Sequence, residues 1–356
     1  MIVMEDVFKK YGEYPQAAIV LDSDFNIIYK NPAAKKDVNI KPRMGVTIKK
    51  YMDSGNMEKL CSAVEHDEFR ILKLDVFSAL KRCVAQPDSN KSVTALVFYS
   101  SLNLLKEGGE NEGEIISKAE DLILKYNRQR KATGKITGGH VSENSKKIAR
   151  INEHFRRHIT NLSPNNTKTT CNIADFLNKF TAGISQYVNS FGYKVGGGKS
   201  ADRMFHHPLN ENDLLLINYI LSAAAFKYSV FNKIDIRFSD DFNKGIIRYE
   251  FRTSKDFIKT HEDMFAGDYL KEMKDIEYLD LNLAALLAKN NDIGLKVYFD
   301  ADESSVFFDL IFKRRNQKNP GKPEVESPLI LNYISAEKVR EGAEIEFAGI
   351  FSKDNI

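Results

Sequence analysis

Three short patterns in this sequence could carry chemistry: a glycine-rich run, a pair of adjacent histidines, and three cysteines. The run GYKVGGGKS at 192–200 is close to a phosphate-binding loop, but Tyr193 stands where the GxxxxGK(S/T) spacing requires glycine. No apolar strand leads into the run, and no apolar helix follows it at once. We therefore expect a flexible turn between helices and no phosphate cradle at this place.

The histidines and cysteines give no sign of a metal or disulfide site. His206 and His207 are adjacent in the sequence rather than one helical turn apart, a spacing that argues against shared metal ligation. The cysteines are odd in number, far apart and without a CxxC pair, namely Cys61, Cys83 and Cys171. This usage predicts neither a disulfide framework nor a structural zinc site, and it is typical of a reducing compartment.

Composition limits the classes of protein that remain. A chain of 356 residues is long enough for two or three domains, each with its own core. Lys and Arg number 52 against 49 Asp and Glu, so the net charge of +3 gives no basic footprint for nucleic acid. The most apolar stretch, 214–226, is shorter than the roughly 20 residues that a membrane span needs. The first residues are acidic where a signal peptide is basic, so we expect a soluble cytoplasmic protein without membrane insertion.

The first hundred residues predict a small antiparallel sheet. Residues 17–31 hold two apolar runs around the turn-forming sequence DSD, which is a hairpin pattern. Residues 45–65 are helical or irregular, and three strand-like stretches follow at 69–77, 78–86 and 91–101. Two strands, a helical middle and three strands make an antiparallel sheet with helices on one side.

Two amphipathic helices follow a Gly- and Glu-rich boundary at 106–114. Apolar residues recur at helical spacing over 114–132, and Ser142 is a plausible N-cap for a second helix that ends near 162. Three apolar residues of the second helix lie seven apart: Ile148, Phe155 and Leu162. This heptad seam predicts a helical hairpin that dimerises, although packing against a neighbouring domain would give the same pattern.

The rest of the chain mixes helices and strands. We expect helices over 172–191, 210–228 and 280–290, and strands over 234–239, 245–252, 295–300 and 305–312. This order predicts a two-layer α/β sandwich with a mixed sheet. We expect a charged, irregular segment over 253–278 and a solvated linker over 313–327. The residues after this linker add either a strand or a docking segment.

This order of parts resembles a cytoplasmic sensor histidine kinase. The sequence AAIVLDSDFNIIYKNPAAKK at 17–36 is similar to the opening of many PAS sensor domains. LLLINYILSAAAFKYS at 214–229 is similar to the N-box helix of the gyrase/Hsp90/histidine-kinase type of ATP-binding domain. DLNLAALLAKNNDIGLKVYFDADESSVFFDLIF at 280–312 is similar to the last helix and strand pair of that domain.

The resemblance implies an α+β chain built from four parts. They are a PAS-like sensor domain with an antiparallel sheet at 1–105, a helical-hairpin dimerisation domain at 106–168, a two-layer α/β sandwich of histidine-kinase ATPase type at 169–316, and a C-terminal tail at 317–356.

The residues that the resemblance places at the nucleotide site differ from those of active members. Ala224 stands where active members carry the Asn that holds Mg²⁺, and a methyl group cannot coordinate a cation that requires oxygen ligands. Ile220 replaces a second polar residue, whereas Lys227 matches the family's basic residue and is either a phosphate contact or a surface lysine. Asp256 is a displaced carboxylate without the family's glycines, and YLDLN at 278–282 replaces the glycine-rich phosphate motif. A degenerate site with no cofactor is expected.

The phosphoacceptor motif of active members is also absent. They present a His followed by an acidic residue on the first hairpin helix, and 114–132 contains no His. His154 and His158 lie on the second helix without a following acid, and His158 falls on the heptad seam, where we expect it to be partly buried and structural. His66 precedes Asp67, but at the entry to a strand. His154 is the candidate phosphoacceptor that remains.

Three functions fit these observations. The first, which we favour, is a catalytically inactive pseudokinase that acts through PAS sensing, dimerisation and partner binding. The second is an active two-component sensor histidine kinase that uses ATP and Mg²⁺, with His154 as acceptor and Lys227 at the nucleotide. The third is a PAS-type small-molecule binding module, although no Cys or His in 1–105 marks flavin or haem attachment. The expected partners are a second copy of the chain and, by resemblance, a response regulator or a related kinase.

Overall fold

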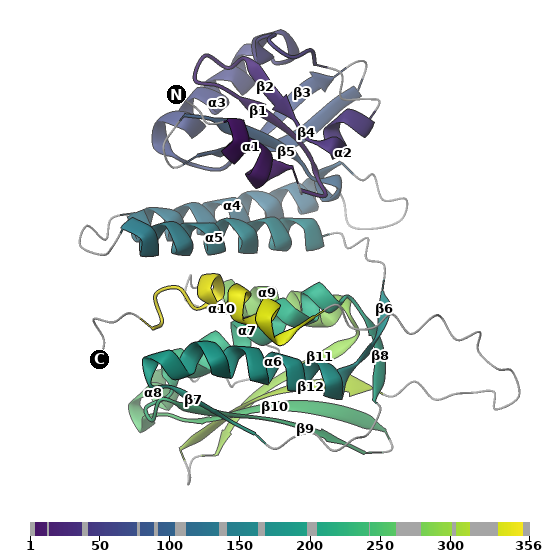
Figure 1. Ribbon diagram of the computed structural model, residues 1–356. Coiled ribbons are helices and arrows are strands. Elements are labelled where there is room, and N and C mark those ends of the chain that lie inside the picture. The colour runs from purple at the N-terminus through teal and green to yellow at the C-terminus, as the bar shows by residue number, and fades with distance from the viewer. Residues whose placement is uncertain are drawn as a thin grey trace, which may run out of the picture. The chain divides into compact units, whose positions relative to one another are not determined.

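The fold was analysed in a computed structural model of the chain (Figure 1). It describes residues 4–12, 14–37, 42–76, 79–88, 92–103, 112–134, 141–162, 168–197, 205–241, 243–260, 279–300, 304–313 and 334–351. Most of the turn expected at 133–140, most of the loop expected at 163–171, most of the irregular segment 253–278 and most of the linker 313–327 lie outside the described residues.

The chain divides into two compact units, which are described separately. Unit 1 comprises Met1–Lys131 and Leu162–Pro164, and unit 2 comprises Ala132–Asn161 and Asn165–Ile356. The two helices that the sequence joins in one hairpin domain therefore fall in different units.

Unit 1 is an antiparallel sheet with helices. Its strands are β1 (Ala17–Leu21), β2 (Ile27–Lys30), β3 (Arg70–Val76), β4 (Ala79–Pro87) and β5 (Thr94–Phe98). Its helices are α1 (Met4–Tyr11), α2 (Pro32–Lys36), α3 (Ser54–His66) and α4 (Glu112–Gly134), with short 3-10 turns at Ile48–Tyr51 and Ser100–Leu102. The strand order is β2-β1-β5-β4-β3, and each neighbouring pair is antiparallel. The five strands expected from the sequence are confirmed.

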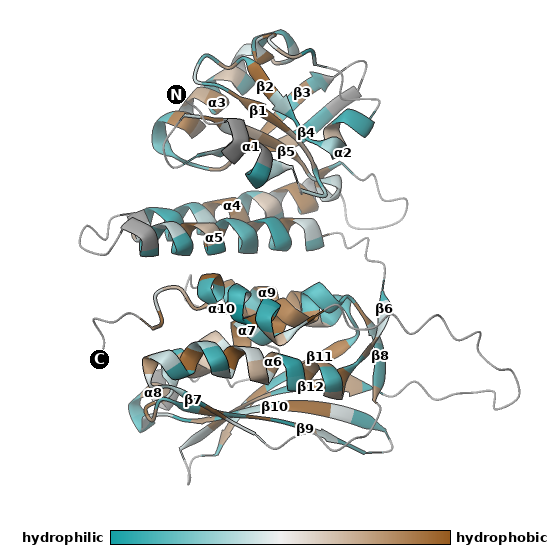
Figure 2. Cartoon of the chain, in the orientation of Figure 1, coloured by the Kyte–Doolittle hydropathy of each residue, from teal (hydrophilic) through white to brown (hydrophobic). Residues whose placement is uncertain are grey.

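Alternation along the strands explains the core of unit 1. Ile19 and Leu21 on β1, with Leu72 and Leu74 on β3, point to the same side and are fully buried against α3. Successive side chains of a strand face opposite sides, so one apolar set fills the core. In Figure 2, the strands of both sheets carry long apolar stretches, whereas α5 presents mainly hydrophilic residues on the side in view.

A buried asparagine connects the first three elements of unit 1. Asn31 caps α2, because its Oδ1 accepts hydrogen bonds from the backbone N–H of Ala34 at 2.8 Å and of Ala18 at 3.0 Å. Its Nδ2 donates to the carbonyl oxygens of Gln16 (2.8 Å), Tyr14 (3.1 Å) and Tyr11 (3.4 Å). One fully buried side chain thus ties α1, β1 and α2 together.

Unit 2 contains the second sheet and a layer of helices. Its strands are β6 (Thr169–Asn172), β7 (Lys194–Gly196), β8 (His206–Leu209), β9 (Lys233–Asp240), β10 (Lys244–Arg252), β11 (Ile293–Asp300) and β12 (Ser305–Lys313). Its helices are α5 (Val141–Asn161), α6 (Ile173–Val188), α7 (Glu211–Tyr228), α8 (Lys255–Thr260), α9 (Leu279–Asn290) and α10 (Ala336–Glu346), with a 3-10 turn at Asn189–Phe191. The main sheet has the order β11-β12-β10-β9-β7 and is mixed, because only β7 and β9 pair in parallel.

The sandwich of unit 2 follows from the pattern of its central strand. On β10, the side chains of Ile247, Tyr249 and Phe251 are buried in the core that the strand shares with the helices. Helix α7 packs against α9, and α6, α7 and α9 each pack against strands of the sheet (Figure 1). The two-layer α/β sandwich and the mixed sheet are thus as the sequence predicts.

Several short elements were not expected from the sequence. Residues 192–197 do not form a simple turn between helices, because β7 lies within them and pairs with β9. The strands β6 and β8 form a separate two-stranded ribbon, with Cys171 opposite His207. The C-terminal segment is a docking helix, α10, rather than a strand.

Candidate functional site

Helix α7 carries a methyl group, not an oxygen ligand, where the resemblance places the metal-binding residue. Ala224 is partly buried and packs against the core of unit 2, and Ile220 is only 3% exposed. The amide oxygen nearest along the helix is that of Asn218, which accepts a hydrogen bond from the hydroxyl of Tyr249, while its Nδ2 donates to the carbonyl of Leu214. Asn218 is fully buried, so it ties α7 to β10 and does not face solvent.

A buried histidine joins three elements of unit 2 that are distant in the sequence. The Nδ1 of His154 on α5 lies 2.9 Å from Oδ1 of Asp280, the second residue of α9. The Nε2 of His154 lies 2.8 Å from Oε2 of Glu346, the last residue of α10. The imidazole is only 2% exposed, so both contacts are largely shielded from water.

The charges around His154 keep it protonated. Burial alone would lower its pKa, but Glu346 and Asp280 outweigh this effect and raise the pKa to about 10. In return, although burial opposes it, His154 and Arg150 hold the pKa of Asp280 well below its usual range. The group is therefore an imidazolium between two carboxylates, and each ring N–H donates to one of them.

Arg150 adds a second cation to this cluster from the preceding turn of α5. Its Nη1 donates to the main-chain carbonyl of Glu346 at 3.1 Å, and its Nη2 lies 3.9 Å from Oδ2 of Asp280. We call Arg150, His154, Asp280 and Glu346 the clasp cluster. In this cluster, the carboxylates of Asp280 on α9 and Glu346 on α10 balance the two positive charges of α5.

This geometry determines what His154 can do. An imidazole attacks phosphorus through a nitrogen lone pair, and an imidazolium with two N–H donors has none to offer. With both nitrogens bonded to carboxylates, His154 serves as a buried cation. Its assignment as phosphoacceptor stays a prediction of the active-kinase alternative and requires that one ring nitrogen lose its proton and its carboxylate contact.

The other sequence candidates are scattered over unit 2. Lys227 is exposed near the end of α7, with its amine 5.1 Å from the ring centroid of Tyr228, and its charge contributes to the low pKa of Asp280. Asp256 is exposed in the first turn of α8. Of the aligned residues 278–282, Tyr278 lies outside the described residues, and the rest form the first turn of α9.

Three other described histidines contact the protein itself: His158, His207 and His66. His158 is 8% exposed, in line with its expected place on the heptad seam. His207 is buried, with its Nε2 3.2 Å from the carbonyl of Asn291, and His66 lies at the end of α3, with its Nδ1 3.0 Å from the carbonyl of Ser62. Among the described residues, no group of three or more His, Cys, Asp or Glu side chains is arranged to hold a metal ion.

A polar hub that no sequence pattern marks connects α7 to α9. The Oδ1 of Asn291 accepts a hydrogen bond from the backbone N–H of Asn210 at 2.7 Å, and its Nδ2 donates to Asp213 at 3.0 Å. Arg157 on α5 lies 3.7 Å from the same carboxylate, whose pKa is nevertheless raised by burial. This hub positions the start of α7 and the end of α9, while the clasp cluster fixes the start of α9.

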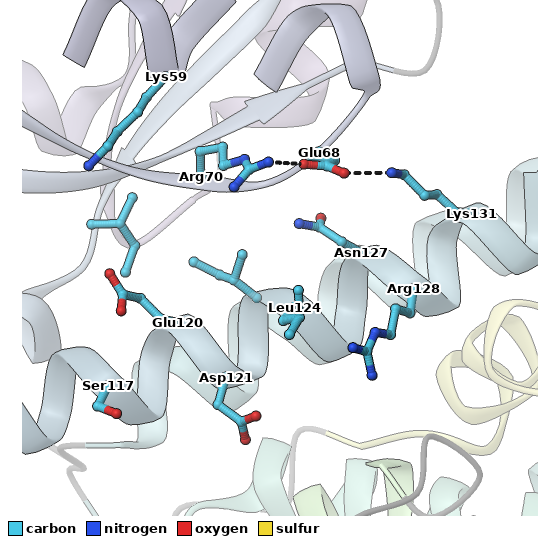
Figure 3. Close-up of a pocket in the computed structure, with 12 residues that line it drawn as sticks. Lys59, Glu68, Arg70, Ser117, Glu120, Asp121, Leu124, Asn127, Arg128 and Lys131 are labelled. Carbon is cyan, nitrogen blue, oxygen red and sulfur yellow. Dashed lines mark hydrogen bonds and ion pairs between the residues drawn. The ribbon is translucent and has the colours of Figure 1, made fainter. Parts of the chain in front are cut away.

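Unit 1 has a groove along α4 (Figure 3). Its volume is about 720 Å³, and the lining residues are Lys59, Glu68, Arg70, Ile71, Ser117, Glu120, Asp121, Ile123, Leu124, Asn127, Arg128 and Lys131. Glu68 bridges Arg70 and Lys131 across one end. The lining combines acidic and basic side chains with the apolar Ile71, Ile123 and Leu124, so it favours neither an anionic nor a cationic ligand.

Comparisons with known proteins place these features beside histidine kinases. No family model matches the chain, and no curated protein matches it. A solved structure of histidine kinase ThkA in complex with the response regulator TrrA is 13% identical, covers 85% of this chain and 97% of that one, and has a TM-score of 0.37.

Two further solved structures are similar. Histidine kinase AdeS of Acinetobacter baumannii is 9% identical over 55% of this chain and 96% of its own, with a TM-score of 0.36. A blue-light activated histidine kinase of Erythrobacter litoralis is 13% identical over 87% and 98%, with a TM-score of 0.31. In the part of the chain that is described, no helix is long and apolar enough to span a membrane.

Proposed function

We propose that the chain is a cytoplasmic signalling protein with the architecture of a sensor histidine kinase, and that it does not transfer phosphate. Unit 1 acts as a PAS-like sensor, the chain forms a homodimer, and unit 2 serves as an interaction surface. The observation that carries the proposal is the state of His154. The one candidate acceptor is buried and holds its charge between Asp280 and Glu346.

Two residues at the positions where the resemblance expects the nucleotide site, Ala224 on α7 and Asp280 on α9, support the same proposal. At Ala224, a methyl group replaces the oxygen ligand that Mg²⁺ requires. At the start of α9, Asp280 places an ionised carboxylate where the resemblance expects backbone amides to meet the nucleotide phosphates, and two negative groups repel each other there. A response regulator or a related kinase is the class of partner that we propose from the sequence resemblance.

Calorimetry with ATP and Mg²⁺ on the full chain tests the proposal. We expect no heat of binding and no shift in melting temperature at nucleotide concentrations up to the millimolar range. Titration with Mg²⁺ alone provides the matched blank. Saturable binding of ATP would instead support the active-kinase alternative. Transfer of labelled phosphate from ATP that is lost in His154→Gln would establish that alternative.

A further inference from the structure

Helix α10 docks on the outer side of the helical layer of unit 2. Its main contacts are with α6, α5 and α7 (Figure 1). Val339 and Ala343 face inward and are fully buried, and Phe347 just beyond the helix is 1% exposed. Glu337 and Glu341 on the opposite face are exposed to solvent. α10 is thus an amphipathic helix laid on a surface made by other helices.

Two glycines allow α10 to approach this surface closely. A Cβ on Gly183 of α6 would lie 2.5 Å from the carbonyl oxygen of Ala336 and 2.6 Å from Cβ of Val339. A Cβ on Gly342 of α10 would lie 2.3 Å from the hydroxyl oxygen of Tyr219 on α7. Neither contact would tolerate a side chain, so the groove on α6 and α7 fits this helix in one position.

Polar contacts fix the register of α10 in the groove. The hydroxyl of Tyr219 donates a hydrogen bond of 2.7 Å to the carbonyl of Val339, and both residues are buried. At the far end of the helix, Glu346 accepts from His154, and its carbonyl accepts from Arg150. The helix is therefore attached to α7 at its centre and to α5 at its end.

Aromatic side chains close the C-terminal end of the contact. Phe351 packs on Tyr193, with ring centroids 4.5 Å apart, and on Phe226 at 5.2 Å. Phe347 contacts Phe226 and Tyr219, with ring centroids about 6 Å away in each case. These rings anchor the last described residues to α7 and to the segment before β7.

We propose that α10 is a detachable clasp, bound in cis to a helix-binding groove on α6 and α7, and that its contact with His154 couples its docking to the position of α5. Two features favour detachment over a permanent core role. The helix supplies its own backbone hydrogen bonds, and the sheet keeps α6, α7 and α9 as cover when it leaves.

Glu346 of the clasp contacts only the first half of α5. Glu346 reaches α5 at Arg150 and His154. Further along α5, Asn161 contacts Asn290 of α9, and Arg157 approaches Asp213 of α7, without any contribution from α10. Opening of the clasp therefore removes the contacts of α10 from the first half of α5, where Asp280 of α9 alone still binds Arg150 and His154, and leaves the contacts of the second half in place.

Protons do not open the clasp near neutral pH. The charged groups that face His154 are Arg150 on α5, Asp280 on α9 and Glu346 on α10, and Lys227 on α7 acts on Asp280. Since the pKa of His154 is about 10, the contact keeps its charges throughout the physiological range. A competing helix in the groove is the agent that fits, because it replaces the apolar and polar contacts of α10 together.

Hydrogen exchange on the full chain tests the clasp. In Glu346→Gln, which removes one charge of a buried pair, we expect exchange in α10 and in residues 141–154 to rise on the order of 10- to 100-fold. We expect residues 157–161 and β10 to keep their protection. Glu341→Gln, on the exposed face of the same helix, is the matched control and should leave every segment unchanged. If β10 accelerates together with α10, or if α10 does not respond, the proposal is overturned.

A second experiment tests the groove itself. Gly342→Val should eject α10 by its clash with Tyr219 and leave the groove open. We expect a fluorescent peptide of residues 334–351 to bind this variant in an anisotropy titration and not to bind the unchanged chain. The same peptide with Gly342→Val should bind neither. If the variant, folded by its circular dichroism, does not bind the unmodified peptide, the groove is not a helix-binding site and the proposal is overturned.

Discussion

The carboxamide of Asn127 on α4 hydrogen-bonds to both main-chain polar groups of Phe69 at the entry to β3. Its Oδ1 accepts from the N–H of Phe69 at 2.8 Å, and its Nδ2 donates to the carbonyl at 3.1 Å. One turn further on, Arg130 binds Asp67 at 2.7 Å, and its guanidinium lies 4.3 Å above the ring of Phe69. Helix α4 is thus attached to the sheet of unit 1 through residues 67–69, which lead into the edge strand β3.

We predict that Asn127→Ala weakens unit 1. The substitution leaves a buried N–H and a buried carbonyl of Phe69 without this partner, which costs about 2–4 kcal/mol. Urea unfolding followed by circular dichroism measures the change. Arg128→Ala, on the exposed side of the same helix, is the matched control and should cost less than about 0.5 kcal/mol. Equal effects of the two substitutions would contradict this role of Asn127.

A larger loss is expected at Asn31. Asn31→Ala removes five hydrogen bonds at once and leaves the carbonyls of the α1–β1 connection unpaired, so the free energy of unfolding should fall by about 3–5 kcal/mol. Asn31→Asp keeps the acceptor that caps α2 but loses the NH2 group that donates three of the hydrogen bonds, so it should give an intermediate value. Thermal unfolding of both variants, with the exposed Ser23→Ala as control, checks this order. An unchanged melting temperature in Asn31→Ala would contradict it.

The apolar pattern of the sequence is enough to predict most of the fold. The run IIRYEFR alternates between buried and exposed residues, so β10 and its neighbours could be placed without any structure. By contrast, β6 and β8 have four residues each and no long alternation, and β8 contains Pro208. α10 was missed as a helix because its interior contributes only Val339 and Ala343 to the core.

The candidate site could be predicted only in part. Ala224 and the absent glycines are local features, so the expectation of a degenerate nucleotide site can be drawn from the sequence, and it stays a prediction. The clasp cluster is different, because His154 lies 126 residues from Asp280 and 192 from Glu346 in the sequence. No spacing rule joins residues so far apart, and each of them alone fits an exposed charged position on a helix. The packing of α5, α9 and α10 in the folded chain brings them together.

The pH dependence of stability should show the shifted pKa of His154. Its pKa rises from the ordinary value of 6.5 to about 10 in the folded chain, so the stability that it contributes is present in full below pH 6.5. This contribution is lost as the pH rises through about 10. Relative to His154→Gln, the unchanged chain should therefore be more stable at pH 6 by on the order of 3 kcal/mol and lose this advantage by pH 10.5.

Urea titrations of both proteins at pH 6, 8, 9 and 10.5 provide the test. The difference between the two free energies of unfolding should be nearly constant below pH 6.5 and should fall between pH 8 and 10.5. An advantage that grows between pH 8 and 10.5 has the wrong sign for a raised histidine pKa. A difference that stays constant over this range would mean that the imidazole is already neutral in the folded chain at pH 8.

Gly183 offers a test in which helix propensity and packing oppose each other. In an exposed helix, Gly→Ala stabilises by roughly 1 kcal/mol, and Gly113, whose added Cβ would meet nothing within 4 Å, should behave in this way. At Gly183, the new methyl would press on a backbone oxygen of α10, so Gly183→Ala should destabilise unit 2 by about 1–3 kcal/mol despite the better propensity. Thermal unfolding of the two variants should give shifts of opposite sign, and shifts of the same sign would refute the close approach of α6 and α10.

The degenerate nucleotide site leads to a prediction about what one substitution cannot restore. Ala224→Asn supplies an amide oxygen on α7, but the first turn of α9 keeps Asp280 ionised beside His154 and has no glycine through which backbone amides could reach a phosphate. We therefore expect Ala224→Asn to bind ATP and Mg²⁺ no better than the unchanged chain in calorimetry. Ala223→Asn, at the neighbouring partly buried position, controls for a nonspecific effect of the amide. Affinity that appeared in Ala224→Asn alone would show that the start of α9 does not exclude phosphate, and the pseudokinase proposal would lose its electrostatic support.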